Sequence, residues 1–196
     1  MKTFDLLEHT NSVIELIQAQ PSLSTQFKSD FASEKVRVIN NNSILRKEIV
    51  PSEGQKQLID SNTKKIVGVS DFTDTVIPDT EVLIVDGIRI GYATHDESGK
   101  AAVLSYNEAI PASVRNAVLR IRQDEDVKYT TSLSELINVN KDFANLADEI
   151  FKLKVPFVLT GGSSIKFEIE YPEGATPVDG KKEYLEIVFS GFKATR

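Results

Sequence analysis

The chain has 196 residues, no cysteine, no tryptophan and a formal net charge of −6 at pH 7. A chain of this length can bury a core without covalent cross-links, and the lack of cysteine excludes disulfides, thiolate nucleophiles and zinc–sulfur sites. The acidic balance and the scattered lysines and arginines disfavour contact with backbone phosphates, so no specific nucleic-acid binding is expected. Length alone predicts one generous domain or two small ones.

The first 35 residues are predicted to form a helical arm that precedes a β-domain over 36–196. A helix is predicted over about 1–20, with apolar residues at helical spacing: Phe4, Leu7, Ile14 and Ile17. Pro21 ends it, and Phe27 and Phe31, four residues apart, predict another helical turn or two. The polar face of the first helix is acidic, which favours docking on its own domain or on a neighbouring subunit over lying on a membrane.

From residue 36 the apolar pattern changes to a period of two, which predicts strands. A hairpin is expected over 36–50 with its turn at 40–42, followed by a short strand at 65–72. The segment 82–94 has two apolar faces, which is typical of a strand covered on both sides. The remaining strands are predicted at 117–123, 127–130, 157–160, 165–171 and 185 to the C-terminus. Several short strands with turns between them point to a sandwich or barrel.

One helix is predicted to interrupt the strands before the closing pair. Ser132 and Glu135 fit a capping box, and apolar residues at helical spacing continue to Leu153, before Pro156. The segment 172–182 is rich in turn residues and is expected to be a long loop.

No reaction chemistry is predicted from the motifs of the chain. His9 and His95 are interpreted as surface histidines. Ser61 and Lys64 match the Ser-x-x-Lys pattern of acyl-serine enzymes, but the partner motifs are missing. The acidic turn 124–126 could hold a weak cation, although the spacing of an EF-hand is absent. The sequence therefore predicts a protein that is not an enzyme and has no catalytic residue, cofactor or metal.

Three segments near the C-terminus carry a family resemblance: Val155-Pro-Phe-Val-Leu-Thr, Ile165-Lys-Phe-Glu-Ile-Glu-Tyr-Pro and Tyr184-Leu-Glu-Ile-Val-Phe-Ser-Gly-Phe-Lys-Ala-Thr-Arg. With the Asp86-Gly-Ile-Arg-Ile-Gly-Tyr-Ala strand and the helix before the closing strands, they are similar to the jelly-roll capsid proteins of tailless, membrane-containing icosahedral bacteriophages. The resemblance covers roughly residues 80–196. Double-barrel members of that lineage are usually longer, which favours one barrel, or a very compact pair, in this chain.

The resemblance implies a mainly β protein: an antiparallel jelly-roll sandwich or barrel of about eight strands, with an N-terminal helix and a helix inserted before the closing strands. It also implies a virion structural protein that self-assembles into an icosahedral phage shell, without a cofactor. Its partners would be copies of itself and other virion proteins, close to an internal membrane. The expected subunit contacts are Phe4, Leu7 and Ile14 in the helix and Gly174, Lys181 and Lys182 in the loop. Deleting residues 1–20 is expected to leave a folded barrel with impaired assembly.

A carbohydrate- or ligand-binding β-sandwich is the main alternative. Such modules present aromatic platforms, and the chain offers five tyrosines but no tryptophan: Tyr92, Tyr106, Tyr129, Tyr171 and Tyr184.

Overall fold

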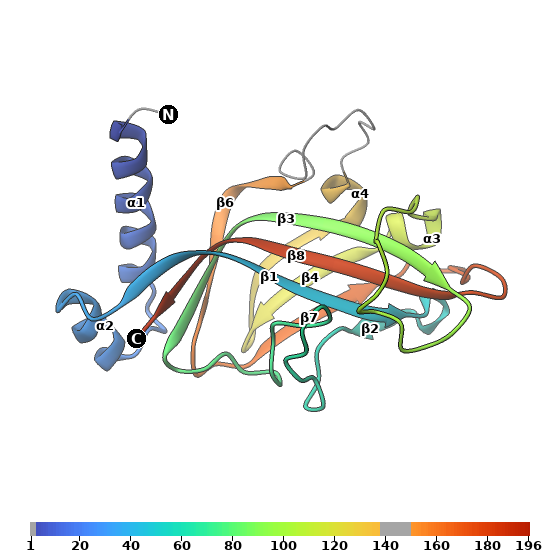
Figure 1. Cartoon of the computed structure of the whole chain (residues 1–196), viewed down its shortest axis with the longest axis horizontal. Coiled ribbons are helices and arrows are strands. Elements are labelled where there is room, and N and C mark those ends of the chain that lie inside the picture. The colour runs from blue at the N-terminus through green and yellow to red at the C-terminus, as the bar shows by residue number, and fades with distance from the viewer. Residues whose placement is uncertain (1–2, 138–149) are drawn as a thin grey trace.

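The computed structural model describes residues 3–137 and 150–196, and of residues 3–10 only the backbone. Within these ranges the protein is mainly β, and eight strands form two antiparallel four-stranded sheets (Figure 1). The long sheet has the strand order β1-β8-β3-β6 and the short sheet the order β2-β7-β4-β5. The strands are β1 (Arg37–Ile49), β2 (Gln55–Gln57), β3 (Glu81–His95), β4 (Val118–Gln123), β5 (Asp126–Ser132), β6 (Phe151–Thr160), β7 (Ile165–Glu170) and β8 (Lys182–Thr195).

The strand pairs are nested around the middle of the chain. β1 pairs with β8, β2 with β7, β3 with β6 and β4 with β5, all antiparallel. Two further ladders, β3 with β8 and β4 with β7, join these pairs into the two sheets. The prediction of an antiparallel β-domain with about eight strands is confirmed.

The core lies between the facing sheets and follows from the alternation of apolar residues. In β7, Ile165, Phe167 and Ile169 are buried, while the charged residues between them are more exposed. Phe167 lies at the centre of an aromatic cluster, with ring centroids 5.1 Å from Phe72 and 5.0 Å from Phe189. Period-two burial of this kind is the expected result of a strand with one face on the core.

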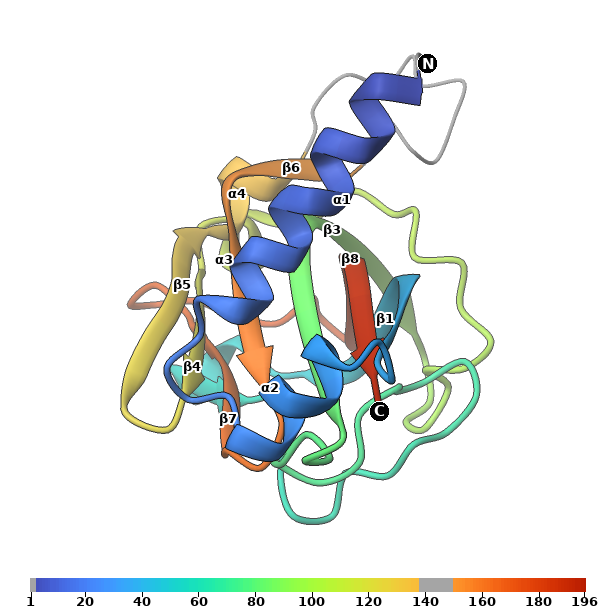
Figure 2. The same ribbon diagram turned by 90° about the vertical axis from the view of Figure 1, so that its left-hand side faces the viewer.

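Two helices precede the strands, as predicted. α1 (Thr3–Gln18) stands at one end of the pair of facing sheets, which is called the barrel below, and α2 (Thr25–Ala32) lies beside it, near the C-terminus (Figures 1 and 2). The side chain of Ser24 caps α2 by accepting a hydrogen bond from the backbone N–H of Phe27, at 3.1 Å. The described residues also include one-turn helices at α3 (Ala112–Arg115), α4 (Leu133–Leu136) and a 3-10 turn at Pro51–Glu53.

The hairpin predicted over 36–50 is wrong, because residues 40–42 continue one strand. Asn40, Asn41 and Asn42 stay paired with Phe192, Gly191 and Ser190 of β8. Asparagine favours turns by its local side-chain hydrogen bonds, but here the ladder with β8 overrides that preference. The strand predicted at 65–72 is also wrong, since this segment forms turns closed by isolated bridges of Ser70 to Leu45 and Ile66.

The helix predicted to run from residue 132 to 153 is correct only at its start. Ser132 caps α4, its side chain accepting a hydrogen bond from the N–H of Ser134. Residues 138–149 lie outside the described residues. The last part is wrong, because Phe151 already belongs to β6 and pairs with Ile88. Short apolar runs fit a strand and a helix equally well, so their period cannot separate the two.

Candidate functional site

The helical arm packs on the outer face of the long sheet at one end of the barrel. Val13 and Ile17 of α1 are buried there with Phe27 of α2, against Val82 and Ile84 of β3. This contact explains the two apolar faces of β3, one of which covers the core and the other the arm. The prediction of a strand covered on both sides is confirmed: the arm covers Val82 and Ile84, and the loop that contains Tyr106 covers Ala93.

Two polar contacts tie the arm to the barrel. The hydroxyls of Ser22 and Thr160 lie 3.1 Å apart, and Thr160 also bonds to the side chain of Gln123 from the opposite sheet. Arg196, at the end of the chain, pairs with Asp30 of α2 at 3.4 Å. The C-terminal half of the arm is therefore anchored, while the N-terminal half of α1 extends away from the sheets (Figures 1 and 2).

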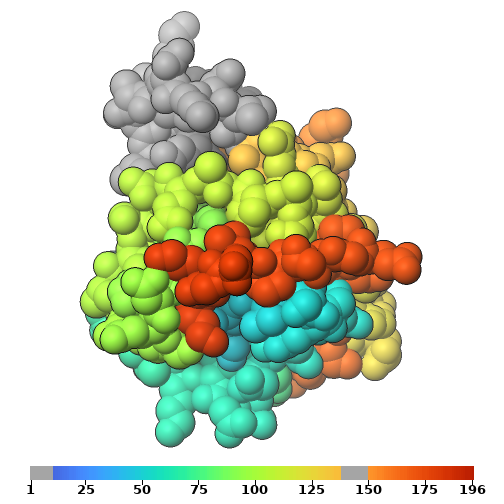
Figure 3. All heavy atoms as spheres, turned by 90° about the vertical axis from the view of Figure 1, so that its right-hand side faces the viewer, coloured from blue at the N-terminus to red at the C-terminus, as the bar shows by residue number. Residues whose placement is uncertain are grey.

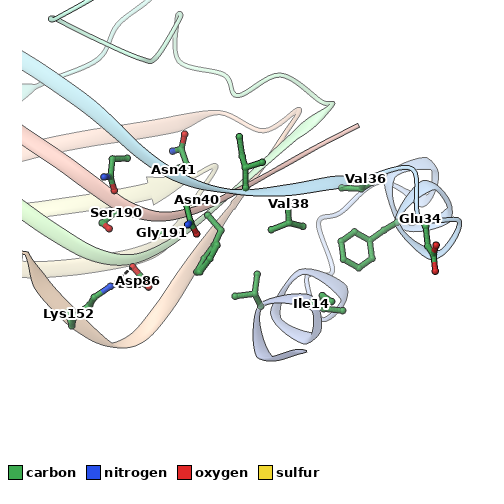
Figure 4. A pocket seen from close by; sticks show the side chains of 15 residues that line it. Ile14, Glu34, Val36, Val38, Asn40, Asn41, Asp86, Lys152, Ser190 and Gly191 are labelled. Atoms are coloured by element: carbon green, nitrogen blue, oxygen red, sulfur yellow. Dashed lines mark hydrogen bonds and ion pairs between the residues drawn. The ribbon is translucent and has the colours of Figure 1, made fainter. Parts of the chain in front are cut away.

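A hollow of about 800 Å³, here called the arm groove, lies between the arm and the outer face of the long sheet (Figure 4). Apolar side chains line its arm side: Val13, Ile14, Phe31, Val36 and Val38. Its other side is formed by the asparagines at 40–42, by Ser190 and Gly191 of β8, and by an ion pair of Asp86 with Lys152 at 3.2 Å. Apolar surface beside amide groups suits an extended polypeptide, which needs both burial and backbone hydrogen bonds.

An ion triad on the outer face of the long sheet joins three neighbouring strands. Glu186 of β8, only 2% exposed, accepts hydrogen bonds from Arg46 of β1 at 2.7 Å and from Arg89 of β3 at 2.6 Å. Arg46 also donates to the carbonyl of Gly68 at 2.8 Å, and its guanidinium lies 4.6 Å from the ring centroid of Tyr106. The triad holds β1 on the sheet, together with the loops that contain Gly68 and Tyr106. Its three charged groups are paired with one another without a ligand.

The loop 172–181 lies across the opposite end of the barrel (Figure 3). Lys181 pairs with Asp96 at 2.5 Å, and this hydrogen bond and the charge of Lys181 lower the pKa of Asp96. Glu183, 1% exposed, holds the loop from inside by accepting from the N–H of Val178 at 2.6 Å, and it also accepts from the hydroxyl of Tyr92 at 2.8 Å. Burial is the main reason that the pKa of Tyr92 is raised, and the contact with Glu183 adds to the shift.

The predicted contact residues do not form one site. Ile14 is half-buried and lines the arm groove, and the side chains of Phe4 and Leu7 lie outside the described residues. The loop residues are at the far end of the barrel: Gly174 and Lys181 are exposed, and Lys182 begins β8 opposite His95. Ile14 and the three loop residues therefore belong to two surfaces, at the ends where Figure 1 shows α1 and the loop before β8.

Sequence reasoning missed two features of these surfaces. The asparagines at 40–42 were assigned to a turn, although an uncharged run between Val38 and Leu45 is also compatible with an edge strand. Glu186 is the second feature, for which the sequence pattern gave no prediction. Its signal was an acid directly flanked by Leu185 and Ile187 in an apolar run, because a buried carboxylate needs a partner.

Two of the residues considered for chemistry, His95 and Asp124, have structural partners. The Nδ1 atom of His95 accepts from the N–H of Glu97 at 2.9 Å, while the side chain of His9 lies outside the described residues. Ser61 and Lys64 lie in a turn region and not on a helix. Asp124 accepts from the N–H of Ser164 at 3.0 Å. In the described ranges, no group of three His, Asp or Glu residues is placed to hold a metal ion.

The tyrosines do not form an exposed platform. Four of them are at most 7% exposed: Tyr92, Tyr106, Tyr171 and Tyr184. Tyr129 is half-buried and stacks on Phe157, with ring centroids 5.6 Å apart. A glycan-binding surface built on these five rings therefore has no support from their positions.

No helix in the described residues is long and apolar enough to cross a bilayer. No family model, curated protein or solved structure matches the chain.

Proposed function

We propose that this chain is a virion structural protein, a single jelly-roll barrel that self-assembles into the shell of an icosahedral phage. The observation that carries the proposal is the nesting of the strand pairs, β1 with β8, β2 with β7, β3 with β6 and β4 with β5. An eight-stranded jelly roll consists of two Greek keys, and an antiparallel ribbon wrapped with these pairs produces it. The two sheet orders agree with this topology.

The fold alone does not select a capsid role, because lectin domains and cupins use the same architecture. The arm provides the second argument. The backbone of its N-terminal half, whose sequence includes Phe4, Leu6 and Leu7, extends away from the sheets (Figures 1 and 2). An apolar helix end that extends from the sheets in this way is suited to cover a neighbouring copy.

The internal chemistry of the barrel supports a structural role. The buried acids Glu183 and Glu186 are held by hydrogen bonds to a tyrosine, a backbone amide and two arginines. Each of these contacts joins a loop or a strand to its neighbour. Under this proposal the protein acts in the virion, its partners are other copies and other virion proteins, and no cofactor or enzymatic activity takes part.

Removal of residues 1–10 tests the role of the arm more sharply than removal of residues 1–20. The longer deletion would take away Val13 and Ile17 and uncover Val82 and Ile84, which would destabilise the barrel itself. The shorter deletion is expected to leave the urea-unfolding midpoint nearly unchanged. In sedimentation velocity it is expected to lack the large species that this proposal predicts for the full chain.

Point variants distinguish the effect of losing apolar side chains from the effect of shortening the arm. Phe4→Ala with Leu7→Ala is expected to weaken assembly as the deletion does, whereas Glu8→Ala is the control and is expected to assemble normally. A shortened chain that sediments like the full chain would remove the arm from the proposal.

A further inference from the structure

The long sheet has an edge whose backbone groups are open over half its length. The C-terminal half of β1 is covered, since Arg46 N–H donates to the carbonyl of Val69 at 2.7 Å and Asp71 N–H donates to that of Ile44 at 3.0 Å. Even-numbered residues of β1 thus turn their N–H and C=O groups away from β8. Because this direction alternates along a strand, Val38, Asn40 and Asn42 turn theirs the same way, and no described residue pairs with them.

The other described edges carry features that discourage pairing, and this one does not. β6 contains Lys152, Lys154 and Pro156, β5 contains Asp126 and Lys128, and β2 has only three residues. Charges, proline and short length are the usual protection of a sheet edge. β1 has neither a charge nor a proline from residue 38 to residue 45.

Residues 38–43 of β1 also line two hollows. The arm groove lies along one face of residues 38–42, and a smaller hollow of about 170 Å³ is lined by Asn41, Asn42 and Ser43. Val38 and Ile39 are 36% and 38% exposed. Figure 4 shows Val38, Asn40 and Asn41 beside the hollow.

We infer that residues 38–42 pair with the same strand of a second copy, antiparallel, about a two-fold axis at Asn40. This inference rests on the self-association proposed above and names the edge at which two copies meet. An antiparallel pair of identical strands is symmetric, so the edge is complementary to itself. With the axis at Asn40, the outward backbone groups of all three residues find partners. Val38 pairs with Asn42 of the second copy, and Asn40 pairs with Asn40 of the second copy, which places their side chains opposite each other.

The pairing joins two long sheets into one continuous sheet of eight strands. The pair is short, so it is a weak contact in isolation and becomes strong only when other contacts of an assembly act with it. The dimer is therefore measured at high protein concentration.

The matched variants are Asn40→Lys and Asn62→Lys in the full chain. Both make the same chemical change, and Asn62 is exposed in a turn outside residues 38–42. In the inferred dimer, Asn40→Lys places two ammonium groups directly opposite each other, which is expected to raise the dimer Kd about tenfold. Asn62→Lys is expected to dimerise like the wild type. Sedimentation equilibrium measures both.

Asn40→Pro tests the backbone hydrogen bonds themselves. The N–H that it removes points away from β8, so the ladder to β8 is retained and far-ultraviolet circular dichroism should be unchanged. This variant is also expected to stay monomeric. A cysteine-free chain allows a positional test: Asn40→Cys is expected to cross-link with a short bismaleimide, and Lys154→Cys, on the opposite edge of the same sheet, is not.

Asn40→Lys that dimerises like the wild type, or a wild type that remains monomeric at every concentration, would overturn the inference. Shells that form equally well from wild type and Asn40→Lys would also refute this pairing while leaving the shell proposal intact. A dimer that cross-links at residue 40 but never grows into particles would support the pairing and refute the shell.

Discussion

Glu186→Gln is expected to lower the free energy of unfolding by about 2–4 kcal/mol, measured by urea denaturation. The substitution keeps the shape of the side chain and removes the charge that two arginines share, at 2.7 Å from Arg46 and 2.6 Å from Arg89. Both arginines are then left close together without a counter-charge. The side chains of Arg46 and Arg89 are 20% and 23% exposed, so water offsets part of the cost.

Glu170→Gln is the matched control for this prediction. Its pair with Arg120 is longer, at 3.3 Å, and the side chain of Glu170 is 55% exposed. Exposed pairs contribute about 0–1 kcal/mol, so this variant is expected to remain close to the wild type. If the two glutamine variants had equal stability, the triad would not hold β1 and its covering loops on the sheet.

Gly191→Ala is expected to cost about 3 kcal/mol or more and to disturb the long sheet where the arm groove begins. Gly191 lies between Asn41 of β1 and Val85 of β3, at the point where the register of β3 shifts. Its φ is +155°, and an added Cβ would overlap the backbone carbonyl of Ile84. That carbonyl belongs to a paired strand and cannot move without breaking the ladder.

Gly174→Ala separates backbone strain from this overlap. Gly174 has a φ of +76° in the loop at the far end of the barrel, and a Cβ there would meet nothing within 4 Å. The strain alone is expected to cost about 1 kcal/mol. Thermal unfolding measures the loss of stability in each alanine variant. The difference between the two losses gives the cost of the overlap at residue 191. Equal losses would show that the sheet absorbs a side chain at residue 191.

The parts of the fold that were predictable from the sequence are those where one face of a strand meets a continuous core. The alternation of Ile165, Phe167 and Ile169 located β7, and the two apolar faces of residues 82–94 indicated a cover on each side. The nature of the second cover could not be read from β3 alone. It depends on Val13 and Ile17, which are far away in sequence.

The open edge of β1 was hidden by local preference. Three successive asparagines favour a turn, and only the pairing with residues 190–192 of β8 shows that the strand continues. The partners of Glu186 could not be predicted from the sequence either, because Arg46 and Arg89 become its neighbours only through the strand order β1-β8-β3. Long-range pairing thus decides where the candidate surfaces lie, and the local sequence does not encode it.

Electron microscopy of the purified full chain over a range of concentrations tests most directly whether this barrel builds a shell. The account predicts closed particles of uniform diameter above a threshold concentration, and their loss when residues 1–10 are removed. A full chain that remains monomeric and dispersed at every concentration, with its sheets intact by circular dichroism, would contradict the account.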